Sequence, residues 1–327
     1  MAPSDLLRPA LLAAARSPRM ERTVTKIPVT RNLVDRFVAG ETENQAVAAT
    51  TDILDSGRYI SIDYLGEDTT DLGQANNTVS HYLTLLSALS QFTQNGEKDK
   101  AAFPPSRVRN VEVSLKLSAL GQFLPQDGHK VALENAHKIC TAADEAGAWV
   151  TVDAEDHSTT DSTLSIVREL RQDFPSLGTV LQAYLKRTEA DCRDLSGPGS
   201  RIRLCKGAYK EPASVAYQGK PAVDDAYLRC LRILMNGQGY PMVASHDPAM
   251  ISAALHFAEA KGRTADEFEL QMLYGIRDAE QLRLVGEQQH LRVYLPYGEQ
   301  WYGYFMRRLA ERPANLAFFL RSLVSTN

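Results

Sequence analysis

Short apolar stretches rich in β-branched and aromatic residues alternate along this chain with longer segments of helical periodicity. The eight short stretches begin at Tyr59, Val111, Trp149, Thr179, Arg201, Pro241, Phe268 and Leu291. Between them lie segments such as VALENAHKICTAADEAGA, residues 131–148, in which apolar or small side chains recur at helical spacing up to Gly147, a residue typical of helix ends. Strands that alternate with helices over short loops predict an α/β protein with a parallel sheet.

The number of strand–helix units predicts the architecture. Eight units within about 240 residues have the size of a (β/α)8 barrel, and a doubly wound open sheet is the alternative. Residues 1–35 are arginine-rich and irregular, so we expect an N-terminal arm, in part helical, before a single domain at 36–327. The stretch NGEKDKAAFPPSR, residues 95–107, is charged and contains two adjacent prolines, which predicts a loop.

Composition narrows the class of protein. Of the 327 residues, 44% are apolar and 23% charged, which is typical of a soluble protein with a sizeable core. The net charge of −4 lacks the basic footprint of a nucleic-acid-binding protein. The cysteines Cys140, Cys192, Cys205 and Cys230 are scattered, so we expect reduced thiols. No apolar run approaches the ~18 residues of a membrane helix, and we expect a cytoplasmic protein, with peripheral contact of the basic arm at the inner face of the membrane left open.

Polar residues mark the carboxyl ends of nearly all the predicted strands, which is where barrel enzymes place their catalytic groups. They are Lys116, Asp153, Glu155, Gln182, Arg203, Lys206, Ser245, His246, Gln271 and Tyr294. Taken singly, each is as readily a solvated side chain or a helix N-cap. Together they predict a polar bowl at one rim of the barrel, which we interpret as the active site.

The absence of several motifs narrows the chemistry of this bowl. The chain has no H-E-x-x-H pattern, no Walker A sequence and no G-x-S-x-G elbow, so zinc, P-loop and acyl-transfer chemistry have little support. The glycine pairs Gly197/Gly199 and Gly237/Gly239 precede strands and lack the third glycine of a dinucleotide-binding loop. We interpret them as turns.

Two adjacent arginines near the end of the chain, in YFMRRLAERPAN at 304–315, form a second candidate site. At helical spacing Tyr304, Arg307, Arg308 and Glu311 share one flank of a helix. A solvated face, a ladder of ion pairs and a clamp for a small anion all fit this spacing. Guanidinium groups match a carboxylate in two parallel hydrogen bonds, so the pair with Lys116 is suited to bind one carboxylate.

Two further cations suggest a second anion. Arg203 and Lys206 belong to the fifth strand and its carboxyl end, and they suit a ligand such as a cofactor with phosphate groups. The residues alone take the interpretation no further.

Seven stretches resemble, in order, the motifs of proline dehydrogenases, the flavin enzymes that oxidise L-proline to Δ1-pyrroline-5-carboxylate. They are SLKLSAL, VDAE, LQAYLKR, RLCKGAY, FELQMLYG, YLPYG and YFMRRLAERPAN. The resemblance runs from about Phe37 to Leu323 and implies a small monofunctional bacterial form, with a distorted (β/α)8 barrel whose final helix lies over the barrel mouth. It also implies FAD as cofactor, no metal, a membrane quinone as electron acceptor, and a pyrroline-5-carboxylate dehydrogenase as a potential partner.

The resemblance implies the roles of individual residues. The catalytic set is Asp153, Arg203 and Tyr294. The substrate-binding set is Lys116, Leu273, Tyr304, Arg307 and Arg308. The cofactor-binding set is Ala154, Gln182, Arg203, Lys206, Gly207, Ala208, Ser245 and His246. Glu67, in DYLGED, resembles a gate residue that pairs with Arg307.

These sets imply a mechanism. The carboxylate of proline would bind to the arginine pair and Lys116, with the ring against Tyr304 and Leu273, and hydride would pass from C5 of proline to N5 of the flavin near Arg203. Because three cations around an empty site repel one another, we expect the segment from Tyr304 to open and close.

The chain departs from the family at two positions. Ser245 stands where the family often has threonine, and Lys210 where some relatives carry tryptophan. Three alternatives remain beside proline oxidation: a flavoenzyme for hydroxyproline or another cyclic amino acid, a non-redox barrel that binds sugar phosphates, and a purely structural barrel. The hydroxyl of Tyr304 would crowd a substituent on the ring, which favours proline.

Overall fold

The computed structural model of the chain describes residues 34–93 and 108–311, with the backbone alone for 309–311. The loop expected at 95–107, the arm up to residue 33, and the motif residues beyond 311 lie outside this range, as does the side chain of Glu311.

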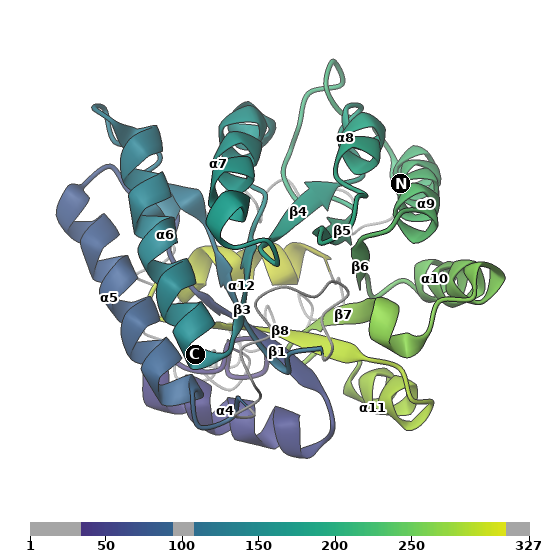
Figure 1. The fold of residues 1–327 in the computed structure, drawn as a ribbon, viewed down its shortest axis with the longest axis horizontal. Coiled ribbons are helices and arrows are strands. Elements are labelled where there is room, and N and C mark those ends of the chain that lie inside the picture. The colour runs from purple at the N-terminus through teal and green to yellow at the C-terminus, as the bar shows by residue number, and fades with distance from the viewer. Residues whose placement is uncertain (1–33, 94–107, 312–327) are drawn as a thin grey trace, which may run out of the picture.

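Eight parallel strands close into a barrel in the order of the sequence (Figure 1). The strands are β1 (Tyr59–Tyr64), β2 (Val111–Leu115), β3 (Trp149–Val152), β4 (Gly178–Gln182), β5 (Arg201–Cys205), β6 (Tyr240–Ala244), β7 (Glu269–Leu273) and β8 (Leu291–Tyr297). Each strand pairs in parallel with the next, and β8 pairs with β1. The prediction of a (β/α)8 barrel is confirmed, and the open sheet is excluded.

Within the described residues, a helix follows every strand, and α4 (Glu43–Asp55) precedes the first. The other α-helices are α5 (Leu72–Leu89), α6 (Gly128–Ala146), α7 (Thr160–Asp173), α8 (Thr188–Asp194), α9 (Lys220–Asn236), α10 (Pro248–Lys261), α11 (Asp278–Gly286) and α12 (Trp301–Glu311). Figure 1 shows α5 to α11 in a ring outside the strands. The predicted stop of α6 is confirmed, because Gly147 has a φ of +74° and its N–H bonds to the carbonyls of Ala143 and Asp144.

The barrel has an apolar outside and a polar inside. In β1, Ile60 and Ile62 belong to the hydrophobic core shared with the helices, whereas Ser61 and Asp63 are buried polar residues. Strand residues alternate between the two faces of a barrel, so the core lies between strands and helices, and the interior is left for polar groups.

Helix α12 has a small hydrophobic cluster of its own. The buried members are Val34, Phe37, Val38, Leu65, Ile276, Trp301, Tyr302, Tyr304, Phe305 and Met306, with Leu273 packed against them. Leu65 follows β1, Leu273 ends β7 and Ile276 follows it, so α12 lies over the carboxyl-end rim of the barrel, as expected. Of the predicted arm, the structure describes Val34 and Asp35, and Val34 is buried in this cluster.

Candidate active site

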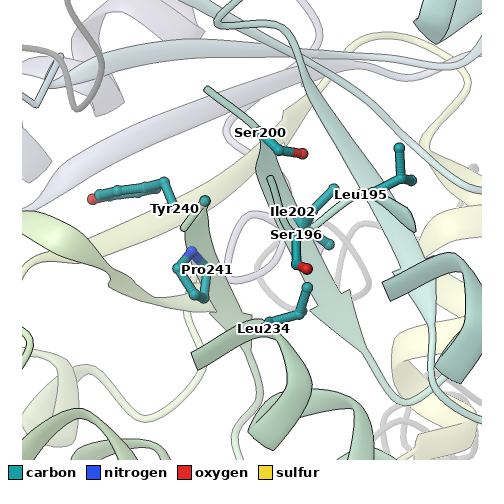
Figure 2. Close-up of a pocket in the computed structure, with 8 residues that line it drawn as sticks. Leu195, Ser196, Ser200, Ile202, Leu234, Tyr240 and Pro241 are labelled. Carbon is teal, nitrogen blue, oxygen red and sulfur yellow. The ribbon is translucent and has the colours of Figure 1, made fainter. Parts of the chain in front are cut away.

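The amino-terminal end of the barrel has a recess without charged side chains. Figure 2 shows a small recess between the starts of β5 and β6, lined by Leu195, Ser196, Ser200, Ile202, Leu234, Gly239, Tyr240 and Pro241. None of these side chains is charged at neutral pH. The charged groups lie in the barrel interior and at the opposite rim, where the sequence predicts the site.

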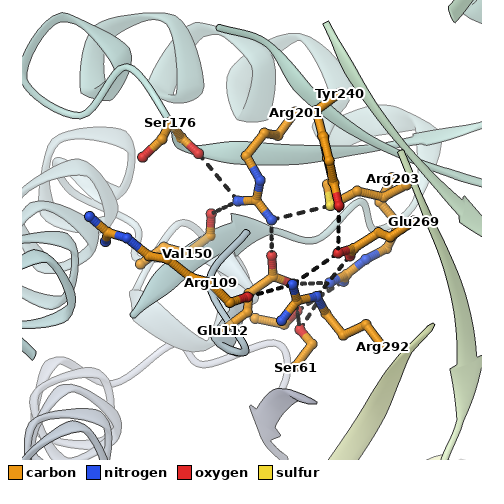
Figure 3. Close-up of polar contacts among 12 residues, drawn as sticks. Ser61, Arg109, Glu112, Val150, Ser176, Arg201, Arg203, Tyr240, Glu269 and Arg292 are labelled. Atoms are coloured by element: carbon orange, nitrogen blue, oxygen red, sulfur yellow. Dashed lines mark hydrogen bonds and ion pairs between the residues drawn. The ribbon is translucent and has the colours of Figure 1, made fainter. Parts of the chain in front are cut away.

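A network of buried charges fills the barrel interior (Figure 3). Glu112 of β2 accepts hydrogen bonds from Arg201 and Arg203 of β5, with 2.6 Å from Arg203 Nη2 to Glu112 Oε1. Glu269 of β7 pairs with Arg292 of β8, with 2.7 Å from Nε to Oε1. Burial raises the pKa of Glu112, but the guanidinium groups around it lower this pKa by more, so Glu112 stays ionised.

Arg203 uses every donor of its guanidinium group. An arginine side chain has five N–H groups, and five side-chain oxygens accept from this one at 2.6–2.9 Å. The acceptors are Gln271 for Nε, Ser114 and Asp153 for Nη1, and Ser61 and Glu112 for Nη2. The role of Arg203 at a flavin nitrogen therefore stays a prediction, and a hydrogen bond there requires that one of these acceptors be released.

Asp153 and Tyr294 form a hydrogen-bonded pair above Arg203. The Tyr294 hydroxyl donates to Asp153 Oδ2 at 2.8 Å, while Arg203 Nη1 donates to Oδ1 at 2.7 Å. Burial and the charges of Asp153 and Asp63 raise the pKa of Tyr294 well above its ordinary value. The phenol therefore stays protonated at neutral pH, and it holds Asp153 in place as a donor.

Asp63, at the end of β1, is a site residue that the sequence analysis missed. Lys116 Nζ lies 2.5 Å from Asp63 Oδ2, so in this structure Lys116 is paired inside the bowl. Burial raises the pKa of Asp63 to about 6, although the ammonium group of Lys116 lowers it. Burial also lowers the pKa of Lys116, but the carboxylates of Asp63, Glu67 and Asp153 together raise it by more. The pair is therefore ionised at pH 7, and Lys116 stays a predicted ligand of a substrate carboxylate.

The arginine pair on α12 lies at the rim. Arg307 Nη2 donates to Glu67 Oε1 at 2.8 Å and Nη1 donates to Oε2 at 3.3 Å, so the guanidinium holds a carboxylate in two parallel bonds. The guanidinium carbon of Arg308 lies 5.1 Å from the centre of the Tyr304 ring, which is a cation–π contact at helical spacing. The function of Glu67 as a gate stays a prediction.

Tyr209 is a second neighbour of this site that the sequence analysis did not single out. Burial first, and then the charges of Glu67 and Glu155, raise the pKa of Tyr209, while Arg307 lowers it. Tyr209 therefore lies within electrostatic range of Arg307 on α12. Its signal in the sequence is an aromatic residue in the loop directly after β5, in RLCKGAY.

The predicted cofactor-binding residues lie at the ends of four neighbouring strands, β3 to β6. Gln182 Nε2 donates to the carbonyl of Glu155 at 2.7 Å, which ties the ends of β3 and β4 together. Gly207 has a φ of +114°, and a Cβ atom there would meet the Tyr184 ring at 2.3 Å. Only glycine therefore lets the chain pass so close to this ring directly after β5.

Two polar members of the cofactor-binding set already have protein partners. Lys206 Nζ binds Asp224 and, at 2.8 Å, Asp247. An ammonium group has three N–H donors, so a phosphate group at Lys206 would share it with these carboxylates. His246 Nε2 accepts from the backbone N–H of Leu273 at 2.9 Å, which fixes the proton of the neutral imidazole on Nδ1.

Glu155 predicts a measurable pH dependence of stability. Burial raises its pKa from 4.5 to about 7, and the charge of Glu67 adds to the shift. Folding therefore takes up a proton, and the stability that this contributes is complete below pH 4.5 and lost as the pH rises through 7. Relative to the wild type, Glu155→Gln should gain melting temperature between pH 5 and pH 8. Glu134→Gln, at an exposed position, is the control. A difference in melting temperature between Glu155→Gln and the wild type that stays constant with pH would contradict the raised pKa of Glu155.

Three further features apply to the residues that the structure describes. Across 34–93 and 108–311, no group of three His, Cys, Asp or Glu side chains is placed to hold a metal ion. Within the same range, no helix has both the length and the apolar character needed to span a bilayer. All four cysteines are free thiols.

Comparison with known proteins identifies the family. The model of the family described as proline dehydrogenase matches residues 46–321. Proline dehydrogenase 1 of Bacillus subtilis is 37% identical over 93% of this chain and 95% of its own length. Proline dehydrogenase of Deinococcus radiodurans is 37% identical over 98% of each chain.

Solved structures agree on the fold. Proline utilization A (PutA) from Bdellovibrio bacteriovorus, inactivated by N-propargylglycine, superposes with a TM-score of 0.77 at 24% identity. The match covers 85% of this chain, which spans 32% of that longer one. The barrel and its polar rim are consistent with the sequence relatives. The chain belongs to the proline dehydrogenase family.

Proposed function

We propose that this protein oxidises L-proline to Δ1-pyrroline-5-carboxylate with FAD as the hydride acceptor. The observation that carries the proposal is the bidentate contact of Arg307 with the carboxylate of Glu67. A guanidinium at the rim of the barrel is thus already shaped and oriented for one carboxylate, which is the charged group that proline offers.

The residues at the rim supply binding and orientation. Arg307 and Arg308 hold the substrate carboxylate, and Lys116 adds a third positive charge. Tyr304 and Leu273, which both belong to or pack on the α12 cluster, contact the ring. Fixing the ring in one orientation removes much of the entropic barrier to reaction.

The catalytic set lies below the substrate. Arg203 and Tyr294 hold the two oxygens of Asp153 by hydrogen bonds of 2.7 and 2.8 Å. Asp153 therefore presents a fixed negative charge toward the bowl. This charge stabilises the positive charge that develops on the ring nitrogen as hydride leaves C5.

The carboxyl ends of β3 to β6 fit the cofactor. The cations of Arg203 and Lys206, the hydroxyl of Ser245 and the backbone at Gly207, which has no Cβ atom, suit a flat ring system with a phosphate-bearing tail. The residues that would hold it are Ala154, Gln182, Arg203, Lys206, Gly207, Ala208, Ser245 and His246. When bound, FAD would supply the redox chemistry by accepting a hydride, that is two electrons and one proton, from proline.

Reoxidation of the cofactor requires an acceptor. We propose a membrane quinone, reached by peripheral contact of the protein with the membrane surface. The reactive imine product suits transfer to a pyrroline-5-carboxylate dehydrogenase as the next enzyme.

The visible spectrum of the purified protein tests the proposal. We expect flavin absorption that bleaches when L-proline is added without oxygen. A flavin band that responds to trans-4-hydroxyproline and not to proline would reassign the substrate. A protein that binds no flavin, even after FAD is added, would exclude the proposal and favour a sugar-phosphate-binding barrel.

A further inference from the structure

The segment that carries Glu67 is a short turn between β1 and α5. Its backbone contains one strained residue, Asp68, with a φ of +57°. This left-handed conformation is unfavourable for a side chain with a Cβ atom, although aspartate tolerates it better than most residues. Such residues persist where the surrounding structure holds them, and they gather at functional sites.

Ser118 holds this turn at two successive residues. Its Oγ accepts from the backbone N–H of Asp68 at 3.1 Å, and its carbonyl accepts from the N–H of Thr69 at 3.1 Å. Ser118 is fully buried and belongs to the 3-10 helix η1 (Leu117–Leu120), which follows β2. The turn is therefore fixed from the neighbouring strand, directly after the residue that pairs with Arg307.

Ser118 is in turn held by Glu155, which lies three residues beyond the end of β3. Glu155 Oε1 accepts from the Ser118 N–H at 3.1 Å, and Oε2 accepts from Ser118 Oγ–H at 2.5 Å. Because its hydroxyl hydrogen is directed to Glu155, Ser118 Oγ presents a lone pair to the N–H of Asp68. A buried carboxylate, 6% exposed, thus sets the direction of the hydrogen bond that holds the turn.

We propose that Ser118 and Glu155 are positioning residues that hold the turn at Asp68 and so present Glu67 to Arg307. The chain of contacts runs from β3 through η1 to the turn, and across to α12. The ion pair itself is a feature of the structure. Only its use in admitting substrate to the site rests on the proposed function.

Amide hydrogen exchange of the purified, substrate-free protein tests the positioning role. We expect Ser118→Ala to speed exchange in α12 and in the turn by about two- to tenfold, the range that one hydrogen bond represents. Glu67→Gln should do the same in α12. Because both changes act on one contact, the double variant should exceed neither single variant by much.

The controls separate positioning from general loosening. Ser196→Ala removes a hydroxyl that donates to the carbonyl of Arg193 beside the recess at the amino-terminal end of the barrel, and it should leave α12 exchange unchanged. Glu155→Ala should reproduce Ser118→Ala, and Glu155→Gln, which keeps one acceptor oxygen, should have a smaller effect. An exchange rate in α12 that Ser118→Ala leaves unchanged would overturn the proposal. So would a double variant in which the effects of the two single variants on this rate multiply.

Turnover separates this inference from the proposed function. If both hold, Ser118→Ala should change KM for proline more than kcat, because it alters the ion pair that a substrate carboxylate replaces. A protein that shows the exchange pattern without oxidising proline would retain the positioning role and lose the proposed function. A protein that oxidises proline but whose exchange does not respond to Ser118→Ala would retain the proposed function and lose the positioning role.

Discussion

Glu112→Ala is expected to lower the free energy of unfolding by about 3–5 kcal/mol, the cost of leaving a buried charge without its partner. Glu112 is fully buried between Arg201 and Arg203, and it also accepts from Ser61 Oγ at 2.7 Å. Its removal leaves two guanidinium groups inside the barrel with too few anions. Urea unfolding of the wild type and the variant measures the difference.

A second variant separates charge from packing. Adding Arg201→Met to Glu112→Ala removes the cation that forms a salt bridge with Glu112, and it should restore part of the lost stability. At the C-terminal end of α11, Glu287→Ala breaks an exposed pair with Arg283 and should cost far less stability than Glu112→Ala. Equal losses for the buried and the exposed glutamate would contradict the importance of the interior network.

Arg307→Met/Arg308→Met is expected to lower kcat/KM for L-proline by about 10²- to 10⁴-fold. A hydrogen bond to a charged group contributes about 1.5–3 kcal/mol, and the double variant removes two guanidinium groups from one carboxylate. The loss should appear in steady-state turnover of proline by flavin-loaded enzyme, with the flavin spectrum unchanged.

A substrate without the carboxylate gives the matched control. Pyrrolidine has the ring and nitrogen of proline but no anion, so the double variant should use it no worse than the wild type does. Arg283→Met, which changes an exposed arginine on α11, should leave proline turnover as it is. A parallel fall for proline and pyrrolidine would mean that the arginines support the helix and do not bind the carboxylate.

The strand pattern was sufficient to predict the barrel, because each of the eight apolar stretches coincides with a strand. The rule that catalytic groups follow strand ends also located most of the polar rim. Asp63 obeys the same rule at the end of YISIDY, and its omission was a failure to apply the rule to β1. Such residues are readable from sequence because their position along the strand fixes their place in the barrel.

The interior network was harder to predict. The sequence shows polar residues two apart in several strands, as in Arg201/Arg203 and Glu269/Gln271, and this spacing places each pair on one face. It does not say which face is interior, nor which carboxylate meets which guanidinium. These pairings join strands far apart in the chain, so they follow from barrel closure and from no local signal.

The partners of Lys206 illustrate the same limit. The sequence suggests a cation suited to an anionic cofactor, while the structure binds it to Asp224 of α9 and Asp247 after β6. These aspartates lie 18 and 41 residues away in sequence. A charge at a strand end can be recognised from sequence, but whether it is already neutralised depends on tertiary contacts.

The contact between Glu67 and Arg307 also sets a threshold for binding. Glu67 is a tethered competitor, whose effective concentration at Arg307 is high because the turn before α5 holds it there. A ligand that binds the same two N–H groups has to displace Glu67. Only molecules in which the ion pair is open can bind this ligand, so the apparent affinity is the intrinsic affinity multiplied by the open fraction. We therefore expect weak anions to bind poorly at Arg307, and we expect a ligand to bind there only when additional contacts, such as those of a ring with Tyr304, compensate for the displaced carboxylate.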